Sequence, residues 1–256
     1  MNTSTISTRI LLGCIWLVAA LTTHICHAGI WTPIYQEDFS SDPGWTTDDP
    51  AKLGWDQATQ TFHGVQVNTE GTFAYTNISS FDPASSWRLE FDARMNSDGW
   101  SAGMDFGLFD PGLSISAGSA SIHQGIGDGG RGIALYGYGP VAGAIFNPAW
   151  SFGTWYHHIM EYDANTNLLT LQMTERATGS TFMDLSITPA PFPADMTRLG
   201  VSRLHMKNAT AGVNPAATAD YNLDNISLSV IPEPATLLLC LLGGIAVLRR
   251  RWRLER

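Results

Sequence analysis

Two pairs of carboxylates in this 256-residue chain are spaced so that they could act together. Glu90 and Asp92 flank a phenylalanine in one strand-like run, and Glu161 and Asp163 flank a tyrosine in another. Residues two apart on a strand share a face, and a retaining glycoside hydrolase needs two carboxyl groups about 5 Å apart. The spacing therefore permits such chemistry. The simpler interpretation, which we favour, is that both pairs are solvent-facing strand residues.

Two short motifs match general catalytic patterns but lack the elements that those patterns require. Gly99–Gly103 fits G-x-S-x-G around Ser101, yet a strand-like run, Met104–Phe109, follows where a nucleophile elbow needs a helix. Gly125–Gly130 fits G-x-G-x-x-G, but no crossover helix follows, so we expect a flexible loop and no nicotinamide cofactor. The sequence therefore predicts no catalytic residue and no enzyme activity.

Calcium is the one cofactor that the sequence leaves open. Asp128 lies in the glycine-rich stretch, and its neighbouring carbonyls, with Asp105 or Asp110, would add hard oxygen ligands if the fold brought them together. The histidines do not suggest a metal site. His157 and His158 are adjacent on an expected strand, so they must point to opposite faces and cannot share one ion.

Aromatic side chains in loops are the better functional candidates. Trp100, Tyr138 and Trp150 lie in or beside Gly- and Pro-rich segments, where an exposed ring could stack on the face of a sugar. Trp45 and Trp55 have a similar setting near the start of the chain. The alternative is that the loops fold back and bury these rings, since large aromatic side chains are usually well buried.

Short strands separated by turn residues must position these side chains. Apolar and charged residues alternate in Trp87–Arg94. We expect Trp87 in this strand and Trp155 in a later strand to face the core. Asp163–Asn167 is typical of a hairpin turn, and a change of parity near Asp224–Asn225 predicts a β-bulge. The other expected strands are Ile34–Phe39, Thr72–Asn77, Met104–Phe109, Gly132–Tyr138, Thr154–Tyr162, Leu168–Thr174, Thr181–Ile187, Leu199–His205 and Asp220–Val230.

About ten short strands at this spacing predict an all-β fold of two packed antiparallel sheets. The run Thr154–Asp163, with Leu168–Leu171 and Thr178–Gly179, is similar to the central hairpin of concanavalin A-like and laminin-G-like jelly rolls. Glu37–Ser40 and Asp224–Leu228 are similar to the ends of such domains in exported bacterial proteins. The resemblance implies a two-sheet jelly-roll sandwich, but folds of this kind host many unrelated activities.

The same resemblance names an enzyme class to weigh. Glucanases of this superfamily place a nucleophile glutamate, an assisting aspartate and an acid/base glutamate on one sheet face. In this chain Ala93–Met95 and Ala164–Thr166 stand where the last glutamate would follow Asp92 and Asp163. This departure from the pattern argues against glycoside hydrolysis.

The N-terminus has the three parts of a secretory signal peptide. Arg9 gives a weakly positive start, Ile10–Leu21 is an apolar region, and Cys26–Ala28 places small residues before a cleavage site. We therefore expect residues 1–28 to be removed on export and the mature chain to begin at Gly29.

Residues 231–256 form the most specific segment of the chain. Its parts are Pro232, Glu233 and Pro234, then the apolar run Ala235–Leu248, then Arg249, Arg250, Arg251 and Arg253. This order resembles the PEP-CTERM tail, which implies processing by an exosortase. As a membrane helix the apolar run rises roughly 21 Å against a hydrocarbon core of roughly 30 Å, which suits a removable anchor. The alternative is an ordinary single-span anchor.

Charge and cysteine content fit an exported body. Gly29–Pro234 holds eight Lys and Arg against 22 Asp and Glu, a formal charge of −14, which repels nucleic acid. Cys14, Cys26 and Cys240 all lie in the terminal segments, so no disulfide can stabilise the expected domain at residues 29–230. Stability must therefore come from its core.

These observations predict an exported β-sandwich that is held in the inner membrane and then sorted to the cell surface or extracellular matrix of a Gram-negative-type bacterium. Its expected partners are the secretion machinery, the exosortase and the membrane, with no nucleic acid. The predicted function is noncatalytic binding of extracellular polysaccharide. A structural or adhesive protein without a small ligand is the alternative, and a divergent glycoside hydrolase is the third possibility.

Overall fold

The structure is a computed structural model. It describes residues 30–67, 72–97, 103–112, 119–127, 130–139, 141–146, 150–201 and 218–231. The signal-peptide and tail predictions, and those for Trp100, Ser101 and Asp128, lie outside these residues. Pro33–Val230 forms one compact unit. Within the described ranges no helix is long and apolar enough to cross a membrane.

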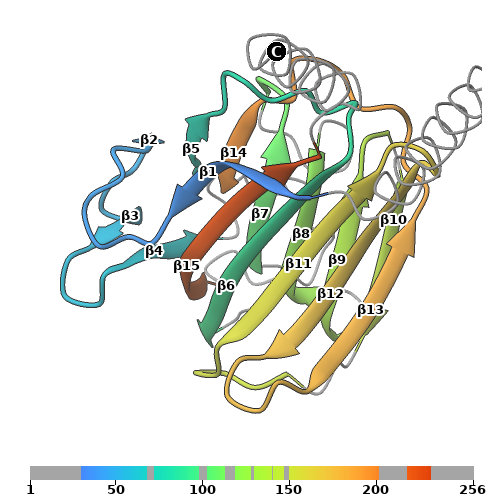
Figure 1. Ribbon diagram of the computed structural model, residues 1–256. Coiled ribbons are helices and arrows are strands. Elements are labelled where there is room, and N and C mark those ends of the chain that lie inside the picture. The colour runs from blue at the N-terminus through green and yellow to red at the C-terminus, as the bar shows by residue number, and fades with distance from the viewer. Residues whose placement is uncertain are drawn as a thin grey trace, which may run out of the picture. The chain divides into compact units, whose positions relative to one another are not determined.

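One of the two sheets has eight strands. They are β1 (Thr32–Glu37), β3 (Leu53–Asp56), β4 (Thr61–Val67), β6 (Trp87–Ser97), β11 (Tyr156–Asp163), β12 (Leu168–Glu175), β13 (Thr181–Ile187) and β15 (Thr218–Val230). The hydrogen-bonded order is β13-β12-β11-β6-β15-β4-β3, with β1 also paired to β15. Figure 1 shows this sheet in front of the other.

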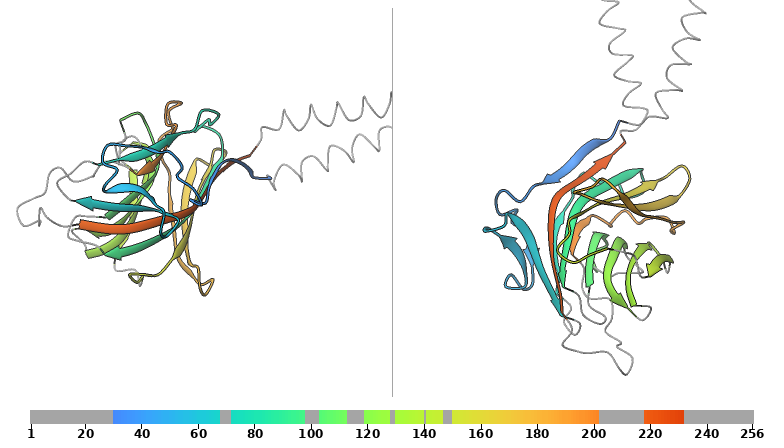
Figure 2. Two further views of the ribbon diagram at one scale, coloured as in Figure 1. Left: turned by 90° about the vertical axis from the view of Figure 1, so that its left-hand side faces the viewer. Right: turned by 90° about the horizontal axis from the view of Figure 1, so that it is seen from below.

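The second sheet has seven strands. They are β2 (Thr46–Thr47), β5 (Ala74–Asn77), β7 (Gly103–Phe109), β8 (Ser119–Gly127), β9 (Gly130–Gly137), β10 (Val141–Phe146) and β14 (Arg198–Val201). Their order is β10-β9-β8-β7-β14-β5-β2, and the recorded pairings in both sheets are antiparallel. Figure 2 shows the two sheets as stacked layers, as the sequence predicts.

The core lies between the sheets and is rich in aromatic rings. Phe91 of β6 meets Phe106 of β7 edge to face, with ring centroids 4.6 Å apart, so the central strands of the two sheets interlock. Trp87 is fully buried, as predicted, and its ring contacts Phe81, Tyr162 and Phe192. Residues 29–230 contain no cysteine, so this packing stabilises the fold without disulfides.

Two local predictions are confirmed. Asp163 closes the β11–β12 hairpin, because its Oδ1 accepts a hydrogen bond from the Asn165 amide at 2.9 Å and Asn167 takes a positive φ of 51°. The register of β15 shifts between Asp224 and Ser227, which places the expected bulge there. Each feature depends on residues adjacent in sequence.

Several strands were not expected from the sequence: β2, β3, β4, β8 and β10. The largest difference concerns Gly125–Gly130, which we predicted to be a flexible loop. Instead, Gly127 ends β8 and pairs with Gly130 at the start of β9. Strand β8 begins with alternating polar and apolar residues, but both of its faces are buried, with Ser119 and Ser121 on one and Ala120 and Ile122 on the other.

Candidate functional site

The carboxylates predicted to face solvent mostly do so. One arginine, Arg88, donates from Nε and Nη2 to Oε2 of Glu161 at 2.9 and 2.7 Å, and its Nη1 lies 3.4 Å from Oε1 of Glu90. Asp163 is engaged in the hairpin turn. This guanidinium therefore holds both glutamates on the outer face of the larger sheet, an arrangement that fits a structural role.

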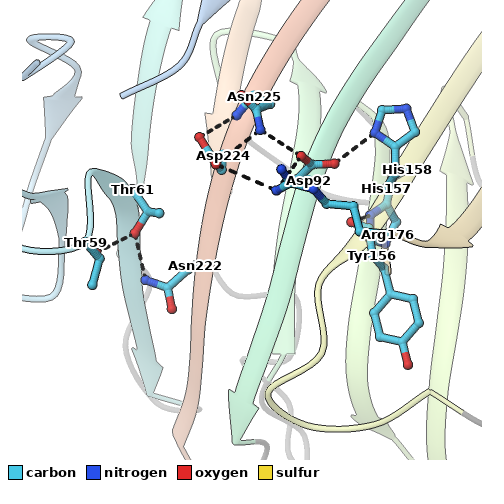
Figure 3. A network of polar contacts seen from close by, with 10 residues as sticks. All are labelled: Thr59, Thr61, Asp92, Tyr156, His157, His158, Arg176, Asn222, Asp224 and Asn225. Carbon is cyan, nitrogen blue, oxygen red and sulfur yellow. Dashed lines mark hydrogen bonds and ion pairs between the residues drawn. The ribbon is translucent and has the colours of Figure 1, made fainter. Parts of the chain in front are cut away.

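Asp92 contradicts the prediction of a solvent-facing residue, because its side chain is only 5% exposed. Figure 3 shows its carboxylate between groups from distant parts of the chain. Oδ1 lies 2.9 Å from Nδ1 of His157, while Oδ2 lies 2.8 Å from Nδ2 of Asn225 and 3.0 Å from Nη1 of Arg176. The β15 bulge and the segment after β12 cover a position that alternation alone places at the surface.

The ionisation of this cluster follows from its contacts. Burial opposes the charge of Asp92, but hydrogen bonds from His157 and Asn225 outweigh it and hold the Asp92 pKa below its usual range. The Asp92 carboxylate in turn raises the pKa of His157. Burial, with the negative charges of Asp92 and Asp38, raises the pKa of Asp224. The cluster is thus built around the ionised carboxylate of Asp92.

The two adjacent histidines point to opposite faces, as predicted. His157 meets Asp92 on the outer face, whereas His158 is fully buried and stacks on Phe91 with ring centroids 4.7 Å apart. Burial lowers the pKa of His158 to about 3, so this imidazole is neutral. Because the two imidazoles lie on opposite faces of the sheet, they cannot bind one metal ion together.

Of the calcium candidates the structure describes Asp105 and Asp110, and these two carboxylates lie apart from each other. Asp105 is buried in β7, and its Oδ1 lies 2.6 Å from Nδ1 of His123. Burial opposes charge on His123, but Asp105 outweighs it and raises the imidazole pKa, so the carboxylate already has a hydrogen-bonding partner. Asp110 caps Gly112 beyond the end of β7, five strand positions or about 17 Å away. Among the described residues no group of three His, Cys, Asp or Glu side chains could hold a metal.

The aromatic candidates separate into buried and accessible rings. Trp150 is only 2% exposed and packs against Phe152, so its assignment as a sugar-stacking ring is wrong. Tyr138 is half-buried and packs against the core. Trp155 was predicted to face the core but is half-buried on the outer face, where the guanidinium of Arg94 lies 5.0 Å from its ring centroid. Trp155 immediately precedes β11, and its parity is opposite to that of the buried residues of this strand.

Trp45 and Trp55 are half-buried, as Tyr138 is, but both line a pocket of about 290 Å³. We call it the tryptophan pocket. Trp45 immediately precedes β2, which pairs with β5 of the seven-stranded sheet, and Trp55 lies in β3, which pairs with β4 of the eight-stranded sheet. The chain crosses here from one sheet to the other (Figure 1). The side chains that matter most in its walls and rim are Asp42, Trp45, Thr47, Pro50, Trp55 and Phe62.

Both indole rings of this pocket are fixed by their N–H groups. Nε1 of Trp45 donates to the Tyr35 hydroxyl at 2.9 Å, and burial raises the pKa of Tyr35 to about 12. Nε1 of Trp55 donates to the carbonyl of Phe39 at 2.8 Å. The Trp45 ring also packs against Phe39 and Phe62, with centroids 5.7 and 5.0 Å away. The rings therefore form a rigid apolar wall before any ligand arrives.

Comparison with known proteins supports the fold. No family model and no curated protein matches the chain. Among solved structures, lectin II from Ulex europaeus aligns with a TM-score of 0.54 at 12% identity, over 77% of this chain and 99% of the lectin. Metal-free lectin I-B4 from Griffonia simplicifolia gives 0.52 at 15% identity, over 76% and 99%. The chain has a concanavalin A-like fold.

That fold alone does not decide between binding and catalysis. An alginate lyase from Aplysia kurodai, titled a marine PL-14 enzyme, also aligns with a TM-score of 0.51 at 10% identity, over 78% of this chain and 99% of the lyase. At such identities only the architecture is shared, and function must be argued from the site. Among the described residues, the tryptophan pocket is the candidate site that we argue from, because aromatic rings line it.

Proposed function

We propose that this protein binds extracellular glycan without catalysis and that the tryptophan pocket is its binding site. A sugar ring has an apolar face of C–H groups and a rim of hydroxyls, so it fits a site with aromatic walls and a few polar groups at the edge. The observation that carries the proposal is the pair of fixed indoles, Trp45 and Trp55, at an open pocket of about 290 Å³.

The binding role is favoured over glycoside hydrolysis by the state of the strand carboxylates. Glu90 and Glu161 are tied to one arginine, and Asp92 is enclosed by its three partners. A general acid must instead be free to reach the scissile oxygen. The described residues around the tryptophan pocket provide rings and a carboxylate rim, which suit recognition.

We expect Trp55→Ala to weaken glycan binding about tenfold, or about 1.4 kcal/mol, because it removes one wall of the pocket. The full-length protein, purified without glycosidic detergents, is first screened on a polysaccharide array and then titrated by calorimetry with the retained glycan. Trp155→Ala is the matched control, since it removes a half-buried indole outside the pocket. Unchanged affinity of a folded Trp55→Ala variant, or no retained glycan at all, would contradict the proposal.

We further propose that export and sorting deliver this site to the cell surface. The supporting features are the signal-peptide pattern at residues 1–28, the Pro232–Pro234 motif and the arginine cluster that follows the apolar run. Intact-mass measurement on protein from the native envelope should find a chain that begins at Gly29 and lacks the segment after the motif. A full-length C-terminus would instead identify an ordinary membrane anchor.

A further inference from the structure

The tryptophan pocket is lined mostly by residues of an acidic stretch of the chain, residues 42–56. Residues 42–56 contain four aspartates and a single cation, Lys52, which gives this stretch a formal charge of −3. Lys52 Nζ lies 3.4 Å from Oδ2 of Asp49, so its charge is directed to one of these carboxylates. A ligand in the pocket therefore meets a negative rim.

Each of the four aspartates is close in sequence to a residue that lines the pocket. Asp42 is itself part of the lining. Asp48 and Asp49 follow Thr47 directly, and Asp56 follows Trp55. Asp42 therefore lines the site directly, and the other three aspartates add to the negative charge of the stretch that carries the pocket walls.

Hydrogen bonds hold three of these carboxylates in place. Oδ1 of Asp42 accepts a hydrogen bond from the Gly44 amide at 2.9 Å, and Oδ1 of Asp48 accepts one from the Phe73 amide at 2.8 Å. Asp56 accepts hydrogen bonds from the Thr59 hydroxyl and the Ala58 amide, which lower its pKa.

We infer that the tryptophan pocket selects glycans that carry protonated amino groups, such as glucosamine polymers, over glycans that carry uronate or sulfate groups. This inference rests on the proposed glycan-binding function and adds the chemical class of the ligand. The indoles bind the apolar sugar face in every case, while the rim attracts an ammonium group and repels a carboxylate or sulfate. Since the rim is exposed, the selectivity depends on salt and weakens once screening shortens the range to about 8 Å.

Three hexasaccharides test the charge preference: fully deacetylated glucosamine, N-acetylglucosamine and a uronic acid. Calorimetric titration of the full-length chain is done at about pH 6, where Asp side chains and uronates are ionised. At low salt we expect glucosamine to bind about tenfold more tightly than uronate, with N-acetylglucosamine between them. Raising the salt should reduce the difference to less than about threefold.

Asp42→Asn tests the origin of the preference, because it removes the charge and keeps the oxygen that accepts the Gly44 amide. We expect the preference for glucosamine over uronate to fall by about threefold, with little change in N-acetylglucosamine affinity. Asp82→Asn is the matched control. Asp82 also precedes a proline and accepts a hydrogen bond from the amide two residues on, that of Ala84, at 3.0 Å, but does not line the pocket.

The outcomes separate this inference from the proposed function. Equal affinity for the charged hexasaccharides, tighter binding of uronate, or equal effects of the two aspartate variants would overturn the charge selection and leave glycan binding intact. Binding of none of the three would remove the support for both. Unfolding curves of each variant show whether a lost preference comes from the site or from the fold.

Discussion

Replacing Asp92 with alanine is expected to lower the free energy of unfolding by about 3 kcal/mol. The carboxylate holds together strand β11 through His157, the β15 bulge through Asn225 and the segment after β12 through Arg176. Its loss leaves these groups facing a buried space with no anion. Because Arg176 and His157 are 47% and 34% exposed and can turn to water, the lower end of the range for buried pairs applies.

Urea denaturation of the full-length protein measures this loss, and Glu90→Ala is the control. Glu90 lies on the same face of the same strand but is half exposed, so its removal should cost about 0.5 kcal/mol or less. Equal costs for the two variants would show that Asp92 is not enclosed as the structure describes.

The pH dependence of the interaction between Asp92 and His157 gives a second measure of this cluster. The Asp92 pKa is lowered in the folded state. Its contribution to the free energy of unfolding is therefore present above about pH 3.8 and is lost as the pH falls through the folded-state pKa. The His157 pKa is raised, so its contribution is complete below about 6.5 and is lost as the pH rises. A double-mutant cycle of Asp92→Asn and His157→Gln should therefore show stronger coupling near pH 5.5 than near pH 8.5.

Local sequence patterns were sufficient for much of the fold. The alternation in Trp87–Arg94 and the polar turn Asp163–Asn167 depend on neighbouring residues, and both are where the sequence places them. Strand β8 carries a weaker signal, because its alternation is limited to Ser119–His123 and glycines follow at Gly125 and Gly127. Its Ser and Gly residues are typical of loops in isolation, and only pairing with β7 and β9 makes them a strand.

The site was less predictable because exposure is set by contacts between distant segments. Trp45, Trp55 and Trp150 have similar neighbours in sequence, yet the first two are half-buried and line a pocket, whereas Trp150 is buried. Asp92 has the parity of an outer-face residue, but Arg176 and the β15 bulge cover it. The prolines and glycines around Trp45 and Trp55 were the available signal, and they indicated a loop without showing which rings it leaves accessible.

Trp87→Ala is expected to lower the free energy of unfolding by about 4 kcal/mol, whereas Trp155→Ala should lower it by about 1 kcal/mol. The sequence predicts that both tryptophans face the core, whereas the structure buries only Trp87, so the two variants test this difference. Trp87 is completely buried and contacts three aromatic rings, at centroid distances of 5.9 to 6.3 Å. Trp155 contacts Arg94 at the surface and would leave no cavity in the core.

A third variant, Trp87→Phe, separates packing from polarity. Nε1 of Trp87 is buried with no hydrogen-bond partner among the described residues, so phenylalanine keeps aromatic packing and removes an unsatisfied donor. We expect it to cost about 1 to 2 kcal/mol, well below the alanine variant. Far-ultraviolet circular dichroism during urea unfolding is the suitable readout, because fluorescence would change with each tryptophan removed. A body without disulfides depends on this core, so equal costs for Trp87→Ala and Trp155→Ala would contradict the assignment of Trp87 to its centre.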